Sequence, residues 1–201
     1  MCSESSSVIA LVLAAGHSRR FGDDKRVARL ATGEMLLAAT VERVRPHVAE
    51  LVVMLRHDDD AQALGLSDIV PIMHAPVAPI GMGVSLSTAV KHVSRAACPH
   101  TALAVVLGDM ALVRPDTLEG LISRVRSDAI VRPVCDGVAG HPVLFGRRFW
   151  PELAALEGDE GARSLLRRHR QHVVGLEVND PGILLDIDTP EDLSSADFHT
   201  Q

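Results

Sequence analysis

The sequence predicts an α/β fold with a Rossmann-like, mainly parallel sheet that is sandwiched by helices. Short, continuous apolar runs alternate with segments whose apolar residues recur at helical spacing, from residue 8 to residue 126. The apolar runs lack polar alternation, which is typical of parallel strands that helices cover on both faces. This alternation of strands and helices indicates βαβ units with right-handed crossovers.

The first part of the chain contains the clearest of these elements. The run TALAVVL is the most strand-like segment, and Pro115-Asp116-Thr117 is a favourable helix start, because proline and polar residues suit a first turn. The predicted strands cover residues 8–13, 51–55, 69–73 and 101–107, and the predicted helices cover residues 34–48, 81–95 and 115–126.

The pattern changes after residue 126, where strands are joined by a glycine-rich connection. No linker composition and no internal repeat interrupts the chain, so we expect residues 1–201 to form one domain whose second half builds a subsite on the same sheet. Residues 1–7 are expected to be a disordered lead-in. The later strands are predicted at residues 129–134, 142–145, 173–178 and 183–187, and the later helices at residues 147–156, 161–169 and 189–196.

Composition excludes several classes of function. Of the 201 residues, 47% are apolar and 23% charged, as in a globular domain, and the net charge of −6 argues against general nucleic-acid binding. The three cysteines lie far apart without a C-x-x-C pair, which favours free thiols in a reducing cytoplasm. The N-terminus has no basic region of a secretion signal, and no apolar run approaches a membrane span.

The polar turn after the first predicted strand is a candidate phosphate-binding loop. Ala14, Ala15 and Gly16 let the backbone approach a ligand, and consecutive amides in such a loop can surround an anion. Arg20 and Lys25 are nearby cations, and Arg19 is a third. The segment matches neither of the best-known phosphate loops, G-x-x-x-x-G-K-[ST] and G-x-G-x-x-G. An ordinary strand-to-helix turn with solvated cations is the alternative interpretation.

Two acidic segments are candidate metal sites. Asp109 directly follows the predicted strand 101–107, at the sheet edge where α/β proteins bind ligands, and one carboxylate there can hold Mg²⁺ together with water and phosphate oxygens. A capping role in a loop is equally compatible with its position. Asp186 and Asp188 are spaced to point to the same side of an extended segment. The Thr189-Pro190 pair that follows is explained by a helix start alone.

Glycines at residues 81 and 83 mark a further candidate loop. Gly81 and Gly83 enter a predicted helix, where they permit close backbone approach to a flat ligand or simply form a tight turn. Ser85 adds a hydroxyl that can hydrogen-bond. Later in the chain, His141 is either a ligand contact or a satisfied, partly buried histidine. Arg163 either holds an anion or is a solvated arginine on a helix.

Together these motifs resemble those of the sugar-nucleotide-type nucleotidyltransferases, most closely the molybdenum-cofactor branch. The resemblance covers nearly the whole chain, in the order in which the family's motifs occur. The matching blocks are L-A-A-G-x-S-x-R-F-G-x-x-K at residues 13–25, G-M-G-x-S-L at 81–86, L-G-D-M at 107–110, G-H-P-V-L-F at 140–145, G-D-x-G-A-R at 158–163 and D-x-D-T-P-E-D-L at 186–193.

The resemblance implies a nucleotide-diphospho-sugar transferase-like fold, with nucleotide bound by residues 8–126 and the acceptor and second metal contact supplied by residues 127–201. It assigns triphosphate and catalytic roles to Arg20 and Lys25, and a magnesium and catalytic role to Asp109. Asp188 is the implied second metal ligand, with Asp186 as the weaker choice. The remaining implied contacts are Leu13, Ala14, Ala15, Gly16, Gly81, Gly83 and Ser85 for the nucleotide, and His141 and Arg163 for the acceptor.

The implied function is a Mg²⁺-dependent nucleotidyltransferase that couples a nucleoside triphosphate to molybdenum cofactor with release of pyrophosphate. Ala14-Ala15-Gly16, rather than A-G-G, resembles the cytidylyltransferases of the branch and points to CTP. Gly33-Glu34-Met35 lacks the basic residue common in the family, so another nucleotide or acceptor, of guanylyl or methylerythritol-phosphate type, remains an alternative. A non-catalytic module that binds or inserts cofactor is a third. A molybdoenzyme or insertion chaperone would be the protein partner.

Overall fold

The computed structural model describes residues 8–16, 21–78, 81–95, 99–185, 187 and 192. The strands are β1 (Val8–Leu13), β2 (Glu50–Leu55), β3 (Ile72–His74), β4 (Ala102–Leu107), β5 (Ile130–Cys135), β6 (Val138–Ala139), β7 (Val143–Gly146) and β8 (Val173–Glu177). The α-helices are α1 (Leu36–Val44), α2 (Met82–Arg95), α3 (Pro115–Ile122), α4 (Trp150–Ala154) and α5 (Arg163–Arg168). Five 3-10 helices are η1 (Lys25–Val27), η2 (Arg45–His47), η3 (Arg147–Phe149), η4 (Arg170–His172) and η5 (Pro181–Ile183).

All eight described strands join one sheet in the order β3-β2-β1-β4-β7-β5-β6, with β8 also paired to β5. The first four strands in this order are parallel to one another. Strand β7 runs antiparallel between β4 and β5, so β5 and its parallel partner β8 return to the direction of β4. The predicted α/β fold with a mainly parallel sheet is confirmed.

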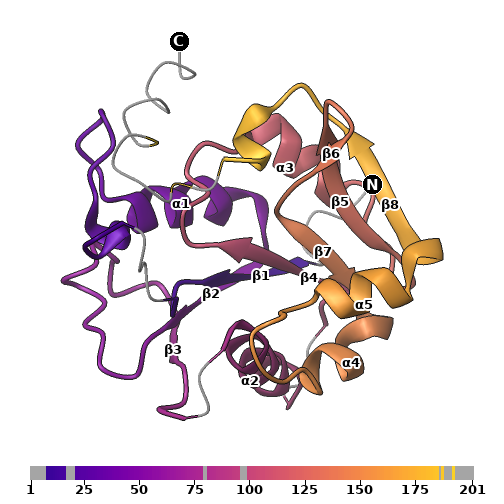
Figure 1. The fold of residues 1–201 in the computed structure, drawn as a ribbon, viewed down its shortest axis with the longest axis horizontal. Coiled ribbons are helices and arrows are strands. Elements are labelled where there is room, and N and C mark those ends of the chain that lie inside the picture. The colour runs from indigo at the N-terminus through magenta and orange to yellow at the C-terminus, as the bar shows by residue number, and fades with distance from the viewer. Residues whose placement is uncertain are drawn as a thin grey trace.

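Helices cover both faces of the sheet, as the uninterrupted apolar strands predict. Side chains alternate along β1, so Val8, Ala10 and Val12 lie in a core that α1 and α3 complete, while Ile9 and Leu11 lie in a second core that α2, α4 and α5 complete. Figure 1 shows α1 and α3 on one side of the strands and α2, α4 and α5 on the other. Every side chain of β1 from residue 8 to residue 12 is at most 2% exposed.

The boundaries differ from the predictions in ways that local chemistry explains. The predicted helix 34–48 ends as α1 at Val44 and continues as η2, which contains Pro46. The third strand is β3, shifted from the predicted 69–73 toward the C-terminus. The two-residue strand β6 was not predicted, because so short a segment carries no periodicity. Of the predicted helix 189–196 only Asp192 is described, in a helical conformation, and the lead-in 1–7 lies outside the described residues.

The prediction of a strand at residues 183–187 is wrong, because η5 occupies its start. The buried side chain of Asp180 caps η5 by accepting a hydrogen bond from the backbone N–H of Gly182 at 3.0 Å. It also accepts bonds from the backbone N–H of Arg114 at 2.9 Å and the hydroxyl of Thr117 at 2.7 Å. Asp180 therefore fixes η5 against the first turn of α3, and the described residues after η5, at positions 184, 185 and 187, do not join the sheet.

We expect Asp180→Ala to lower the free energy of unfolding by about 2–4 kcal/mol, because it leaves several buried donors without an acceptor. The measurement is equilibrium urea unfolding followed by circular dichroism. Asp116→Ala, which removes an exposed carboxylate from the first turn of the same helix, is the matched control and should cost no more than about 1 kcal/mol. Equal losses in the two variants would contradict the role given to Asp180.

Across the part of the chain that the structure describes, no helix combines the length and apolar character needed to span a bilayer.

Candidate active site

The candidate phosphate loop begins where three parallel strands end. Leu13 of β1 is in register with Leu107 of β4, and the backbone N–H of Gly108 donates to the carbonyl of Leu13 at 3.0 Å. The N–H of Ala14 donates to the carbonyl of Met54 in β2 at 2.9 Å. The loop and the Gly108-Asp109 turn thus emerge side by side at the carboxyl edge of the sheet, where open α/β sheets bind ligands.

Lys25 links three segments that are distant in the sequence. Its Nζ donates to Oδ2 of Asp109 at 2.6 Å and to the backbone carbonyl of Ile187 at 2.9 Å. Asp109 is only 8% exposed, and Ile187 is buried against Leu36 and Ala111. Ile187, which lies between the candidate carboxylates Asp186 and Asp188 in the sequence, is therefore close to Asp109.

The oxygens around the Lys25 ammonium suit a divalent cation. Asp109 and Ile187 both direct an oxygen to one cationic nitrogen, so a positive charge is accommodated at their meeting point. Mg²⁺ commonly binds through one or two carboxylates and completes its shell with water and substrate phosphates. Among the described residues, no group of three or more histidine, cysteine, aspartate or glutamate side chains could hold a metal ion. The oxygens of Asp109 and Ile187 therefore suit a divalent metal whose remaining ligands are the phosphate oxygens of a substrate.

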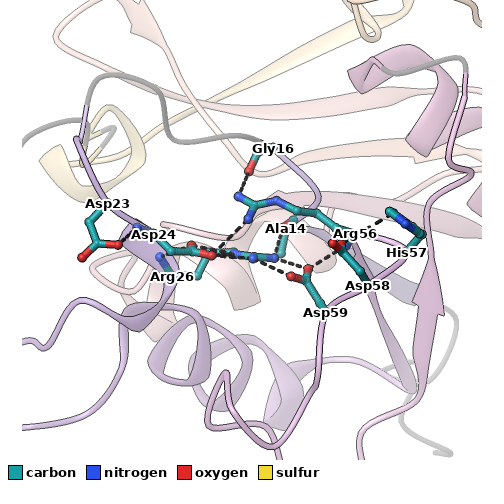
Figure 2. A network of polar contacts seen from close by, with 9 residues as sticks. All are labelled: Ala14, Gly16, Asp23, Asp24, Arg26, Arg56, His57, Asp58 and Asp59. Carbon is teal, nitrogen blue, oxygen red and sulfur yellow. Dashed lines mark hydrogen bonds and ion pairs between the residues drawn. The ribbon is translucent and has the colours of Figure 1, made fainter.

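A network of charged side chains binds the backbone carbonyls of the loop (Figure 2). The guanidinium of Arg26, which is 4% exposed, binds both carboxylate oxygens of Asp24 and of Asp59, and donates to the carbonyl of Ala14 at 2.9 Å. Arg56 follows β2 and donates to Asp24 at 3.1 Å and to the carbonyl of Gly16 at 2.6 Å. Two guanidinium groups thus hold two carbonyls of the loop.

This support orients the backbone for anion binding. In a trans peptide the N–H points away from the C=O, so the Ala14 carbonyl held by Arg26 turns the N–H of Ala15 to the opposite side. The network itself is balanced in charge, with two guanidinium groups facing two carboxylates. Hydrogen bonds from Arg26 hold the pKa of Asp24 at about 2, so this carboxylate is ionised at neutral pH.

Sequence reasoning missed this network. The run Asp58-Asp59-Asp60 suits a helix start by its acidic residues, but residues 57–65 form only turns and irregular backbone. Asp59 pairs with Arg26, 33 residues away, and accepts from the backbone N–H of Arg56 at 2.7 Å. The only local signal was a basic residue directly after Lys25.

The glycine loop at the start of α2 packs against the G-D-x-G-A-R segment. The N–H of Gly83 donates to the carbonyl of Gly158 at 2.9 Å, and the N–H of Met82 donates to Oδ1 of Asp159 at 3.2 Å. A Cβ at position 81 would lie 2.4 Å from the Gly158 carbonyl oxygen, and one at position 83 would lie 2.7 Å from that of Glu157. This close packing accounts for both glycines, and their contact with a nucleotide base stays a prediction.

His141 lies within the electrostatic reach of the Asp109 carboxylate. Its backbone N–H donates to the carbonyl of Ile183 at 3.0 Å. Burial lowers the pKa of the imidazole to about 4, and the charges of Arg132 and Arg163 outweigh the opposing influence of Asp109. His141 is therefore neutral at physiological pH. Arg132, in β5, was not predicted, although a basic residue inside the apolar run IVRPVC was a usable signal.

The structure thus brings most of the predicted residues to one end of the sheet, while others cannot be placed. Leu13 and Ala14 contact Gly108, the neighbour of Asp109, and Ala15 and Gly16 continue the same loop. Lys25 binds Asp109, and His141 and Arg163 lie within electrostatic reach of each other. Ser85 is buried in the first turn of α2. Arg20, Asp186 and Asp188 lie outside the described residues.

Comparison with known proteins gives the class of this fold and site. Residues 10–173 match the model of the MobA-like NTP transferase domain. The chain is 28% identical to the purine catabolism protein PucB of Bacillus subtilis, with 92% of this chain and 93% of the relative covered. It is 24% identical to the molybdenum cofactor cytidylyltransferase of Escherichia coli, with 95% and 96% covered.

Solved structures share this fold. The homolog of Mycobacterium tuberculosis Rv0371c from Mycobacterium sp. strain JC1 has a TM-score of 0.81 at 29% identity, with 94% of this chain and 96% of that chain covered. Rv0371c itself, in complex with manganese, has a TM-score of 0.75 at 26% identity, with 96% and 98% covered.

The fold is that of a nucleotidyltransferase. The family match covers most of the sequence, so the chain belongs to the family of MobA-like NTP transferase domains.

Proposed function

We propose that this chain transfers a nucleotidyl group from CTP to a phosphorylated acceptor of molybdopterin type, with Mg²⁺ as its metal and in the cytoplasm. The observation that carries the proposal is the convergence of Lys25, Asp109 and the Ile187 carbonyl beside the loop at residues 14–16. The Escherichia coli cytidylyltransferase, with its 24% identity over nearly the full length, supports the acceptor class. A molybdoenzyme or insertion chaperone is the proposed partner for the product.

The reaction joins two anions, so its barrier lies in charge and alignment. An acceptor phosphate oxygen forms a bond to the α-phosphorus, and the bond from that phosphorus to the bridging oxygen of the β-phosphate breaks, which releases pyrophosphate. The acceptor is already ionised at neutral pH, so no general base is required. Mg²⁺ held by Asp109, and by Asp188 as the proposed second ligand, would neutralise phosphate charge. Lys25 and Arg20 would bind the β- and γ-phosphates.

A second candidate keeps the reaction and changes the substrates. Two observations support a different acceptor or a different nucleotide base. The chain is 28% identical to PucB, and it has Glu34 and Met35 where the family commonly has a basic residue and proline. A screen of the four nucleoside triphosphates with molybdopterin cofactor and Mg²⁺, read out as pyrophosphate, separates the two. We expect the highest rate with CTP. A higher rate with another triphosphate would reassign the base, and no pyrophosphate from any pair would refute the proposal.

Lys25→Ala is expected to weaken binding of CTP by at least about tenfold and that of CMP by less than about threefold, because the proposed phosphate partners of the ammonium are the β- and γ-phosphates, which CMP lacks. Isothermal titration calorimetry with Mg²⁺ and each nucleotide is the measurement. Lys91→Ala removes an exposed lysine from α2 and serves as the matched control. Equal losses for CTP and CMP would show that Lys25 does not bind the terminal phosphates.

A further inference from the structure

Arg132 carries a partly buried charge without a counter-ion among the described residues. Its Nε is buried and has no hydrogen-bond partner, and its one hydrogen bond is long, from Nη2 to the carbonyl of Gly140 at 3.3 Å. Burial alone lowers the pKa of the guanidinium, with no carboxylate acting against that effect. A buried charge is costly unless it is paired, so this arrangement opposes folding unless an anion binds there.

A second unsatisfied nitrogen belongs to a residue within electrostatic reach of Arg132. His141 follows Gly140, the residue that Arg132 contacts, and its Nδ1 is also buried without a partner. Buried polar groups are almost always hydrogen-bonded. Four buried side-chain nitrogens of the described residues lack a partner, and only those of Arg132 and His141 lie on neighbouring segments, which points to a ligand that supplies both missing acceptors. A neutral imidazole can donate one hydrogen bond in its Nδ1–H tautomer without adding charge. Arg163 adds a positive charge within electrostatic reach of His141.

The position of this pair separates it from the triphosphate site. Arg132 is in β5, which β7 separates from β4, whereas Lys25 and the loop after β1 lie on the other side of β4. Asp109, at the end of β4, lies between the two groups and acts on both Lys25 and His141. An anion at Arg132 would therefore lie across β4 from the candidate phosphate loop.

We propose that Arg132, together with the already implied acceptor residue His141, binds the phosphate monoester of the acceptor. This inference rests on the proposed function, because it assigns the nucleophile of that reaction. Arg132 supplies the planar donor fork that suits phosphate oxygens, and His141 supplies a neutral donor. The uncompensated charge of the ligand-free protein is then a feature of the binding site, and its removal need not destabilise the fold.

The test uses inorganic phosphate as the probe, with binding followed by calorimetry and by the melting temperature. Arg132→Gln is expected to weaken phosphate binding by at least about tenfold, to leave CTP binding within about twofold, and to melt at or above the temperature of the wild type in phosphate-free buffer. Arg126→Gln, which removes an arginine from an exposed pair with Asp128, is the control and should change none of these. Arg132→Lys should retain part of the phosphate affinity.

Two results would overturn the inference. One is phosphate binding that survives in Arg132→Gln but disappears in Lys25→Ala, since phosphate would then bind only at the triphosphate loop. The other is a lower melting temperature in both Arg132 variants with unchanged phosphate binding, as a purely structural arginine predicts. Failure of the proposed function is distinguishable, because the loss of phosphate binding in Arg132→Gln would stand even if no nucleotide released pyrophosphate.

Discussion

Asp109→Asn is expected to lower the rate of pyrophosphate release by about 10³-fold or more. The substitution keeps the size of the side chain but removes its charge, and a metal that neutralises phosphate contributes several kcal/mol to the transition state. Asp109 is the carboxylate that the described structure places at the junction of the loop, Lys25 and residue 187. Loss of its charge therefore removes the anchor of the proposed metal site.

The measurement is single-turnover pyrophosphate release, combined with Mn²⁺ binding followed by electron paramagnetic resonance in the presence of CTP. Asp68→Asn, which changes an exposed carboxylate, is the matched control and should behave as the wild type. A rate within tenfold of the wild type for Asp109→Asn would eliminate this carboxylate as a metal ligand. A non-catalytic binding module would show no release with any variant.

Arg26→Met is expected to lower the free energy of unfolding by about 2–4 kcal/mol, because removing one partner of a buried ion pair leaves the other charges uncompensated. Asp24 and Asp59 are partly exposed, which places the loss at the lower end of the range for buried pairs. The variant also loses the donor that holds the Ala14 carbonyl, so CTP binding should weaken together with stability.

A compensated variant separates the two effects. In Arg26→Met with Asp59→Asn, the ion pair of Arg56 and Asp24 remains and its charges balance, so stability should recover while CTP binding stays weak. Arg29→Met, which removes an exposed arginine nearby, is the control for side-chain loss in this segment. Recovery of CTP affinity along with stability would show that the network acts on folding alone and does not position the loop.

Acid stability provides an independent check of the same network. The pKa of Asp24 is lowered from 3.8 to about 2, so its stabilising contribution is present above about pH 4 and is lost as the pH falls toward 2. Arg26→Met removes the largest cause of this shift. The wild type should therefore lose more stability than the variant between pH 4 and pH 2, and equal pH profiles would contradict the assignment.

Local sequence patterns were sufficient to predict the strands whose side chains are buried on both faces of the sheet. The apolar runs of β1, β2 and β4 predicted strands covered on both faces because each side chain lies in one of two cores. The same logic failed at residues 183–187, where an apolar run follows Pro181 and Gly182. There the buried capping side chain of Asp180, with partners more than 60 residues away, outweighs the tendency of the run to form a strand.

The sequence by itself determined the α/β class, the loop after the first strand and the place of Asp109 at a strand end, because these depend on residues adjacent in the chain. Only the tertiary structure decided that Lys25 meets Asp109 and Ile187, 84 and 162 residues away, and that Arg26 and Arg56 hold the loop. Strand order brings those segments together, and periodicity along one segment carries no information about which strands become neighbours.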